Sequence, residues 1–258
     1  IVARAEALAQ LDREREARRG LQRLVDAETK DPRVYLALGR LLFAARRNDE
    51  AVAMLREAKD RAPLDSSIQI EVADQFERHG LHQEALELYA NLADNDPRLR
   101  PDLAWRMAVI MQEAGARPGP QGDLVERYYQ MALQANPNHL MSLNNLAFHY
   151  AEYDRELPTA RQLADRALEL QGSDPNLLDT RGWVALKLGD LPGASKYLAR
   201  ALSKRPNDAL TLYHWARLRQ KLGDAAGAKA AARRALTLSP KFIGRDACAG
   251  LVEGGGTE

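Results

Sequence analysis

The sequence predicts an all-α protein in which pairs of helices stack one on another. Small residues recur at a period of about 34 positions, and prolines punctuate the chain at nearly the same period. No segment alternates between apolar and polar residues for long enough to predict a strand. Hydrophobic residues make up 45% of the 258 residues, which is ample for a packed interior.

The second helix of each predicted pair carries two small-residue registers seven positions apart. The later register reads Ala27, Ala58, Leu92, Ala132, Ala167, Ala201 and Ala235. The intervals between successive members are close to the repeat period, except that the first is shorter and the third is longer. The earlier register reads Gly20, Ala51, Ala85, Val125, Ala160, Ala194 and Ala228. Between them lie Leu24, Leu55, Tyr89, Tyr129, Ala164, Leu198 and Ala232. Spacings of three, four and seven place all three sets on one helical face.

The first helix of each pair carries one small residue, at what we call the seam position. The seam residues are Gly39, Ala73, Ala108, Ala147, Gly182 and Ala216. A turn glycine follows seven positions later in four repeats, at Gly80, Gly115, Gly189 and Gly223, and polar residues at 46–49 and 152–154 take its place elsewhere. Asp31, Asp96 and Asp174 directly precede prolines, so we expect them to cap helices.

This pattern resembles the tetratricopeptide repeat (TPR) family over nearly the whole chain. The resemblance implies a right-handed superhelical solenoid of about seven helix-turn-helix units over residues 1–240. The predicted units are 1–31, which is degenerate, 32–65, 66–100, 101–139, which contains an insertion, 140–174, 175–208 and 209–240. Residues 241–258 are predicted to form a short capping segment, through Phe242, Ile243 and Leu251, and a disordered tail at Gly254–Gly256.

Several function classes are excluded by composition and motif. The 37 basic and 36 acidic residues give a net charge of +1, which argues against nucleic-acid binding. No apolar run approaches the ~20 residues that span a bilayer. His79 and His82 lack further ligands at metal-binding spacing, and Cys248, which lies in the predicted tail, is assigned no role. We therefore predict no enzymatic activity, metal or cofactor, and we read the insertion at 116–122 as a tolerated loop.

The candidate binding surface is the concave side, which in TPR proteins is lined by the first helices. Nine residues at inward positions are the predicted partner-binding groove: Trp105, Val109, Gln112, Asn144, Phe148, Asp179, Trp183, Tyr213 and Arg217. Lys187 and Lys221 share this face. The four aromatic residues predict a stripe of anchors for a partner, since large rigid side chains dominate interfaces. The alternative is that some of them fill the gap between helix pairs.

The leading hypothesis is a non-catalytic scaffold that binds a segment of a protein partner in this groove. The resemblance extends to multi-TPR envelope proteins of bacteria, some of which act in exopolysaccharide assembly, and it implies a bacterial source. Because the chain lacks Met at position 1, the alternative is the TPR portion of a larger exopolysaccharide assembly or export protein, or of an enzyme. Polysaccharide stays open as a groove ligand. The sequence leaves open the partner's identity, the oligomeric state and the compartment, which is either the bacterial cytoplasm or the periplasm and envelope.

Overall fold

The computed structural model describes residues 2–11, 13–115 and 119–253, and it forms fifteen helices and no strand in these ranges. The first eight helices are α1 (Val2–Gln10), α2 (Glu14–Asp26), α3 (Pro32–Ala44), α4 (Asn48–Arg61), α5 (Ser66–Arg78), α6 (His82–Asn95), α7 (Arg100–Glu113) and α8 (Pro120–Ala135). The others are α9 (Leu140–Glu152), α10 (Leu157–Leu170), α11 (Pro175–Lys187), α12 (Leu191–Lys204), α13 (Ala209–Lys221), α14 (Ala225–Leu238) and α15 (Arg245–Glu253).

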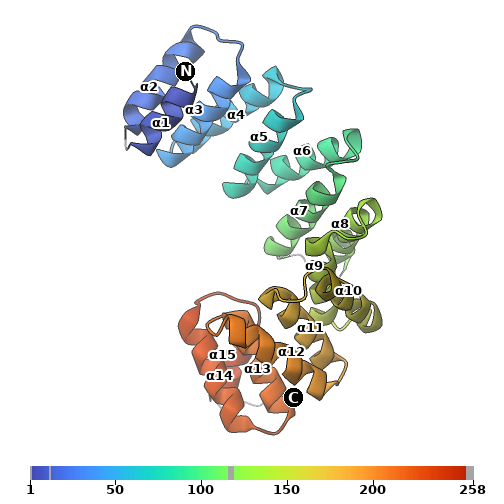
Figure 1. Ribbon diagram of the computed structural model, residues 1–258. Coiled ribbons are helices and arrows are strands. Elements are labelled where there is room, and N and C mark those ends of the chain that lie inside the picture. Colours follow the sequence, from blue (N-terminus) through green and yellow to red (C-terminus); the bar gives the residue numbers. More distant parts are fainter. Residues whose placement is uncertain (1, 12, 116–118, 254–258) are drawn as a thin grey trace. The chain divides into compact units, whose positions relative to one another are not determined.

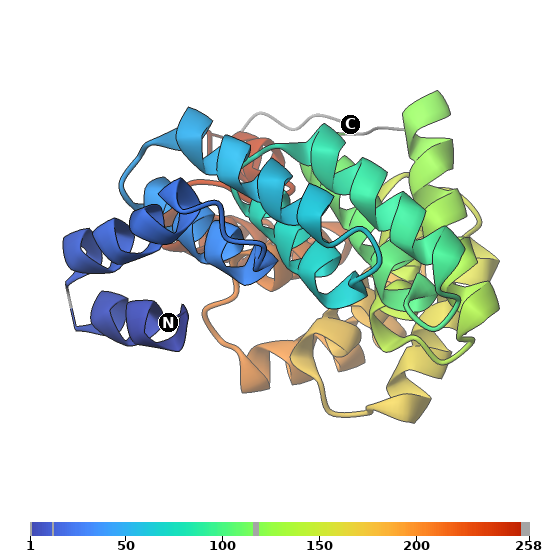
Figure 2. The same ribbon diagram turned by 90° about the horizontal axis from the view of Figure 1, so that it is seen from above.

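The chain divides into two compact units between Met131 and Ala132, within α8. In the N-terminal unit each helix from α1 to α4 packs on the next, as do α5 and α6, and Figure 2 shows α3 to α6 lying side by side. In the C-terminal unit α9 packs with α10, α11 with α12 and α13 with α14 (Figure 1). The first helices also contact each other, α9 with α11 and α11 with α13. Each unit is therefore a stack of helix pairs, as the repeat predicts.

The predicted small-residue face of the second helices is confirmed from the second repeat onward. The early register is at most 1% exposed at Ala51, Ala85, Val125, Ala160, Ala194 and Ala228. The residue four positions later is equally buried at Leu55, Tyr89, Tyr129, Ala164, Leu198 and Ala232. Small side chains on this face allow the second helix to approach its partner closely, so the core runs along the seam between the two helices.

The predicted register of the first repeat is wrong. Gly20 and Ala27 are exposed, whereas Ala17 and Leu21 are buried on α2. These two buried residues lie one full repeat period before Ala51 and Leu55, their equivalents on α4. On α1, the buried Ala5 precedes the seam residue of α3 by the same period. The short interval between Ala27 and Ala58 in the predicted register is thus a misalignment. The helices α1 and α2 form a pair in phase with the repeats that follow.

Two of the three predicted aspartate caps are confirmed and one is wrong. Asp31 and Asp174 accept hydrogen bonds from the backbone N–H of Arg33 and Asn176, each at the start of a first helix. Asp96 instead ends α6, and its carboxylate accepts from the backbone N–H of Arg98 at 3.0 Å. Because this turn intervenes after Pro97, α7 begins only at Arg100. A proline after aspartate therefore marks a turn here and not a helix start.

The turns within pairs adopt the backbone that the sequence predicts. All four predicted turn glycines have positive φ, between 76° and 88°. In the repeats without glycine the same position is held by Arg46 at φ 58° and Asp154 at φ 52°. The left-handed turn is therefore kept by the fold even where a side chain strains it.

A short helix, α15, follows the last repeat and packs on α14 and α13. Cys248 lies on α15 and is fully buried, so it belongs to the packed structure and not to a tail as predicted. Residues 116–118 of the predicted insertion and the predicted disordered segment Gly254–Gly256 lie outside the described residues.

An arginine ladder, absent from our predictions, links successive repeats in the C-terminal unit. Arg166, Arg200 and Arg234 recur at the repeat period on the second helices. Their guanidinium groups donate to Asn138 Oδ1 at 2.6 Å, to the Gly172 carbonyl at 3.2 Å and to Asn207 Oδ1 at 2.6 Å. Each arginine thus links the second helix of its repeat to the loop that precedes the first helix of that repeat. The arginine occupies the same position in all three repeats.

The helices α11 and α12 approach each other closely at the seam of α11. A Cβ atom placed on Gly182 would lie 2.6 Å from Leu198 Cγ and 3.1 Å from the Leu198 backbone nitrogen. In the repeats before and after, alanine occupies the seam, at Ala147 and Ala216, and the position equivalent to Leu198 in sequence register is also alanine. The repeat with the larger residue on its second helix, Leu198, therefore has the smaller residue on its first helix, Gly182. The two residues together fill the space between the helices.

Replacing Gly182 with alanine should lower the free energy of unfolding by about 1–3 kcal/mol, because the added methyl group overpacks the seam. In a Leu198→Ala background the same change should cost nothing or stabilise the protein. Urea unfolding followed by circular dichroism measures both steps of this double-mutant cycle. Gly20→Ala, where a Cβ meets nothing within 4 Å on an exposed helix face, is the matched control and should stabilise slightly. An equal effect of Gly182→Ala in both backgrounds would contradict the seam account.

One buried histidine makes the stability of the fold depend on pH. His149 lies on α9, is fully buried and stacks edge-on against Tyr153 with ring centroids 5.0 Å apart. Burial, with the positive charge of Arg155 as a second cause, lowers the pKa of His149 to about 4. The imidazole is therefore neutral in the folded protein at pH 7.

The unfolded protein binds a proton at His149 near pH 6.5, whereas the folded protein binds it only near pH 4. Stability should therefore fall by roughly 2–3 kcal/mol as the pH drops from about 6.5 to 4. In His149→Gln this contribution should disappear, since glutamine does not titrate. Urea unfolding of both proteins at half-unit pH intervals gives the difference. A difference that stays constant across this range would show that His149 is protonated in the fold.

Candidate functional site

Seven of the nine predicted groove residues line three hollows, each within one unit, and Gln112 and Tyr213 line none of them. The first, here called the N-terminal hollow, has a volume of about 240 Å³. Trp105 and Val109 of α7 line it together, as predicted, and both are half-buried. Its other lining residues are Asp74, Glu77, Arg78 and Arg106. Gln112 lines none of these hollows, and its side-chain oxygen accepts a hydrogen bond from the hydroxyl of buried Tyr129.

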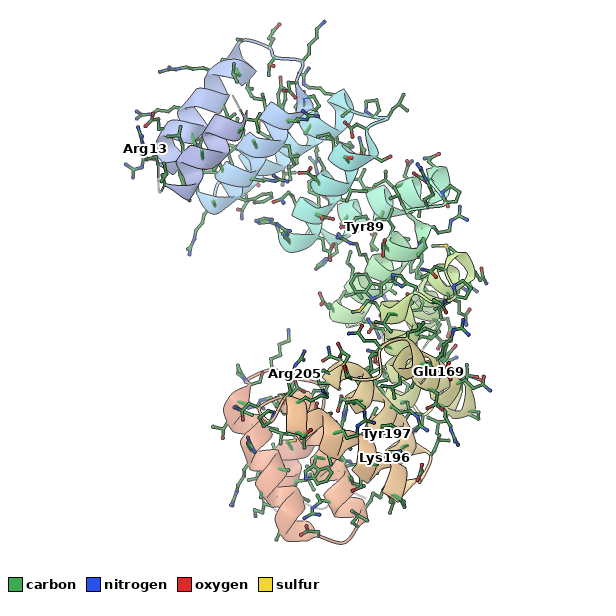
Figure 3. The ribbon with its side chains drawn as sticks, viewed as in Figure 1. Arg13, Tyr89, Glu169, Lys196, Tyr197 and Arg205 are labelled. Carbon is green, nitrogen blue, oxygen red and sulfur yellow. The ribbon has the colours of Figure 1, made fainter. Side chains whose placement is uncertain are left out.

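The charged groups of the N-terminal hollow largely satisfy one another. The Tyr89 hydroxyl, on α6 (Figure 3), lies 2.7 Å from a carboxylate oxygen of Asp74 and 2.7 Å from one of Glu77. Arg106 pairs with Asp74 and donates to the Tyr89 hydroxyl at 2.8 Å. Burial raises the pKa of Tyr89, so its hydroxyl remains a donor. The network holds α5, α6 and α7 together and leaves Trp105 and Val109 as the apolar part of the hollow.

The second hollow, the asparagine hollow, lies in the C-terminal unit and has a volume of about 280 Å³. It is lined from three first helices, α9, α11 and α13, and includes the predicted residues Asn144, Phe148 and Asp179. Asn144 donates to Asn145 Oδ1 at 3.2 Å, while its own side-chain oxygen has no hydrogen-bond partner. Phe148 is half-buried and Met141 is 45% exposed at the rim. The hollow therefore combines an apolar wall with a buried acceptor that has no hydrogen-bond partner.

The third hollow, the basic hollow, lies where α11 and α13 end and has a volume of about 450 Å³. Trp183 and Arg217 line it, together with Lys187 and Lys221 from the predicted inner face. Leu186, Leu191, Gly189 and Asp154 complete the lining. Three cations and one carboxylate thus surround an apolar floor.

The predicted stripe of four exposed aromatic residues is not formed. Trp183 is only 3% exposed and Tyr213 only 7%, and both rings pack on His214. The Trp183 and His214 rings are stacked, with centroids 4.2 Å apart and an interplanar angle of 17°. The Phe148 ring centroid lies 6.0 Å from that of the same imidazole. In the C-terminal unit the aromatic residues therefore fill the space between first helices, which was the alternative expectation for them.

His214 organises this cluster, and sequence reasoning gave it no specific role. The histidine is fully buried, and its Nδ1 lies 2.9 and 3.0 Å from the two carboxylate oxygens of Asp179. Asp179 is therefore engaged inside the protein and does not offer a free carboxylate to a partner. The only sequence signal was a spacing close to one repeat period, which places Asp179 and His214 on neighbouring first helices.

Two other classes of site are absent from the described residues. No group of three or more His, Cys, Asp or Glu side chains there could hold a metal ion. No helix in the same part of the chain is long and apolar enough to cross a bilayer.

Comparison with known proteins identifies the repeat. The family model of the tetratricopeptide repeat matches residues 32–63 and 209–242. A TPR repeat-containing protein of Pseudomonas aeruginosa is 26% identical over 159 residues, which are 61% of this chain but only 26% of that protein. The chain thus spans about a quarter of this relative's length.

Solved structures agree at the level of the fold. A tetratricopeptide repeat protein from Parabacteroides merdae matches with a TM-score of 0.68 and 12% identity, covering 98% of this chain and 96% of that one. A chain of the APC/C hetero-tetramer Cut9-Hcn1 matches with a TM-score of 0.66 and 18% identity, covering 97% of this chain and 48% of that one. Proteins of this fold generally act as non-catalytic scaffolds that mediate protein–protein interaction. The matched repeats and the helix-pair architecture show that the chain contains tetratricopeptide repeats.

Proposed function

We propose that this chain is a non-catalytic scaffold that binds an extended segment of a protein partner in the asparagine hollow. The observation that carries the proposal is the shared lining of this hollow by α9, α11 and α13, three consecutive first helices. A partner segment that crosses three helices contacts three repeats at once. One chain of the Cut9-Hcn1 hetero-tetramer has the same fold as this chain, and its place in an assembly supports an interaction role.

The chemistry of the asparagine hollow fits a polypeptide backbone with an apolar side chain. The Asn144 side-chain oxygen has no hydrogen-bond partner but is itself buried, so it can accept from a peptide N–H once the side chain turns outward. The half-buried Phe148 ring and exposed Met141 offer apolar surface to a neighbouring side chain. The buried Asp179–His214 pair below holds α11 against α13. Because the walls are already packed, the partner bears most of the ordering cost.

A second candidate is the TPR portion of a larger exopolysaccharide assembly or export protein of bacterial origin, with polysaccharide contacting the groove. The alignment with only 26% of the Pseudomonas relative favours a role as one part of a longer protein. Sugar binding by aromatic stacking has less support, since the buried Trp183 and Tyr213 present no open ring face.

The test is selection of peptides from a random display library on the intact chain, followed by fluorescence anisotropy with the tightest peptide. Phe148→Ala should weaken binding about tenfold, since truncating an aromatic anchor typically costs above 1 kcal/mol. Leu170→Ala, which removes a 46% exposed apolar side chain at the end of α10, is the matched control and should leave affinity unchanged.

Trp183→Ala serves as a packing comparison and should lower the melting temperature, because it empties part of the buried cluster. Phe148→Ala should lower the melting temperature less than Trp183→Ala, because Phe148 is only half-buried at the edge of that cluster. Failure to select any peptide, or equal losses in Phe148→Ala and Leu170→Ala, would reject the peptide-binding function.

A further inference from the structure

The second helices of the last two repeats, α12 and α14, carry positive charge and no acidic residue. Residues 191–238 contain ten basic and only two acidic residues, although the whole chain holds 37 and 36. Both acidic residues are engaged as helix caps, Asp208 before α13 and Asp224 before α14. The second helices α4, α6, α8 and α10 all contain Asp or Glu, so the helix-pair fold does not itself require this charge.

Within the described ranges, no carboxylate pairs with the cations of these two helices. Arg200 and Arg234 of the arginine ladder donate to neutral oxygen acceptors. The side chains of Lys204, Lys229 and Arg233 have no ion pair or hydrogen bond within residues 2–11, 13–115 and 119–253. Five of the six cations are exposed and are here called the basic face: Lys196, Arg200, Lys204, Arg233 and Arg234. Like charges on one surface repel each other, so an anionic partner would relieve this repulsion.

A hollow of about 460 Å³, here called the outer hollow, is lined by both of these helices and by α13. Its apolar walls are accessible, since Ala199 and Ala230 are exposed and Leu202 and Trp215 are half-buried. Arg234, which has no carboxylate partner among the described residues, belongs to the same lining. The outer hollow therefore joins accessible apolar surface to positive charge that is not neutralised, and it shares no lining residue with the asparagine hollow.

The spread of the charge and the apolar walls together decide between anionic partners. A nucleic acid presents phosphates but no aliphatic surface that would cover walls of alanine and leucine. One acidic side chain of a protein neutralises one or two cations, whereas the basic face extends over two helices. A bilayer that contains anionic phospholipid presents many phosphates in one surface, with acyl chains directly beneath them. Tryptophan is also enriched at the level of lipid headgroups, and Trp215 lines the outer hollow.

We propose that the basic face and the outer hollow bind the surface of a membrane that contains anionic phospholipid. The exposed cations of α12 and α14 contact lipid phosphates, and one acyl chain enters the outer hollow against Leu202 and Trp215. This proposal goes beyond the proposed function, because it adds a membrane to the partners of the chain. A scaffold held in this way would present its asparagine hollow at a membrane surface.

The experiment uses the intact chain and two vesicle preparations, phosphatidylcholine alone and phosphatidylcholine with about 30% phosphatidylglycerol. In co-sedimentation at pH 7.4 and low salt, the partition coefficient should be about a hundredfold higher on the anionic vesicles, because three or more cations each contribute about fivefold. The preference should shrink as NaCl rises to about 0.5 M, because salt screens exposed charges.

A second readout tests the entry of an acyl chain into the outer hollow. Bromine atoms on an acyl chain quench tryptophan fluorescence only at close contact, and among the three tryptophans only Trp215 lines this hollow. Anionic vesicles with brominated chains should therefore quench the unchanged protein. Trp215→Phe, which keeps Trp105 and Trp183, should lose the quenched component. Vesicle binding without this quenching would contradict the entry of an acyl chain.

The decisive variant is Lys204→Gln with Arg233→Gln, which should lower the partition coefficient on anionic vesicles about 25-fold, through the loss of two contacts. The control is Arg23→Gln with Lys30→Gln, which removes the same charge from exposed positions of the N-terminal unit and should keep full binding. Circular dichroism melts check that both variants fold. Equal partition into the two kinds of vesicle, or equal losses in both variants, would overturn the proposal.

Three further outcomes separate this surface from the proposed function and from another class of partner. If a selected peptide binds through Phe148 but anionic vesicles do not bind, the membrane proposal fails and the proposed function stands. If anionic vesicles bind through Lys204 and Arg233 but no peptide can be selected, the proposed function fails and the membrane proposal stands. Binding of a fluorescein-labelled DNA duplex through the same two residues, without vesicle binding, would assign the basic face to nucleic acid and reject the membrane.

Discussion

The structure depends on the close approach of two helices across a seam of small side chains. A single helix pair cannot bury its apolar face, so each pair must stack on its neighbours, and the stacking distance is set at the seam. At Gly182 there is no room for a single methyl group against Leu198, while neighbouring repeats place alanine at the corresponding positions. Because the seam fixes the first helices, it also fixes the spacing of the side chains that project from them into the hollows. The arginine ladder adds a second link between repeats at Arg166, Arg200 and Arg234.

The same packing explains why the first helices of the C-terminal unit present hollows and not an aromatic stripe. Trp183 and Tyr213 project from the first helices, yet both rings pack against the His214 ring and are buried. Asp179 pairs with that histidine, which places the pair below the surface. What remains accessible is the rim of this cluster: Asn144 and Phe148 in one hollow, and Arg217 and Lys221 where the helices end. The two hollows differ in charge, since basic side chains line only the second.

The fold could be predicted from spacing because the seam requires small residues at fixed positions, whatever their surroundings. Prediction from spacing failed at the first repeat. Gly20 and Ala27 have the spacing of the small-residue register, but the residues buried at the equivalent positions are Ala17 and Leu21. It failed again at Asp96, since only the backbone after Pro97 decides whether a turn or a helix begins. Five residues singled out by helical position do line hollows: Trp105, Val109, Asn144, Phe148 and Arg217. The exposed fraction of each side chain could not be predicted, because it depends on which side chain the neighbouring repeat packs against it. The role of His214 is likewise visible only in the three-dimensional structure.

The central claim is that rigid first helices carry the binding surface and that the partner alone becomes ordered. Amide hydrogen exchange of the intact chain, with and without its tightest selected peptide, tests this most directly. The account predicts added protection confined to α9, α11 and α13, with α10, α12 and α14 unchanged apart from any uniform gain in global stability. Protection concentrated on the second helices, or a bound peptide that leaves the first helices unaffected, would contradict it.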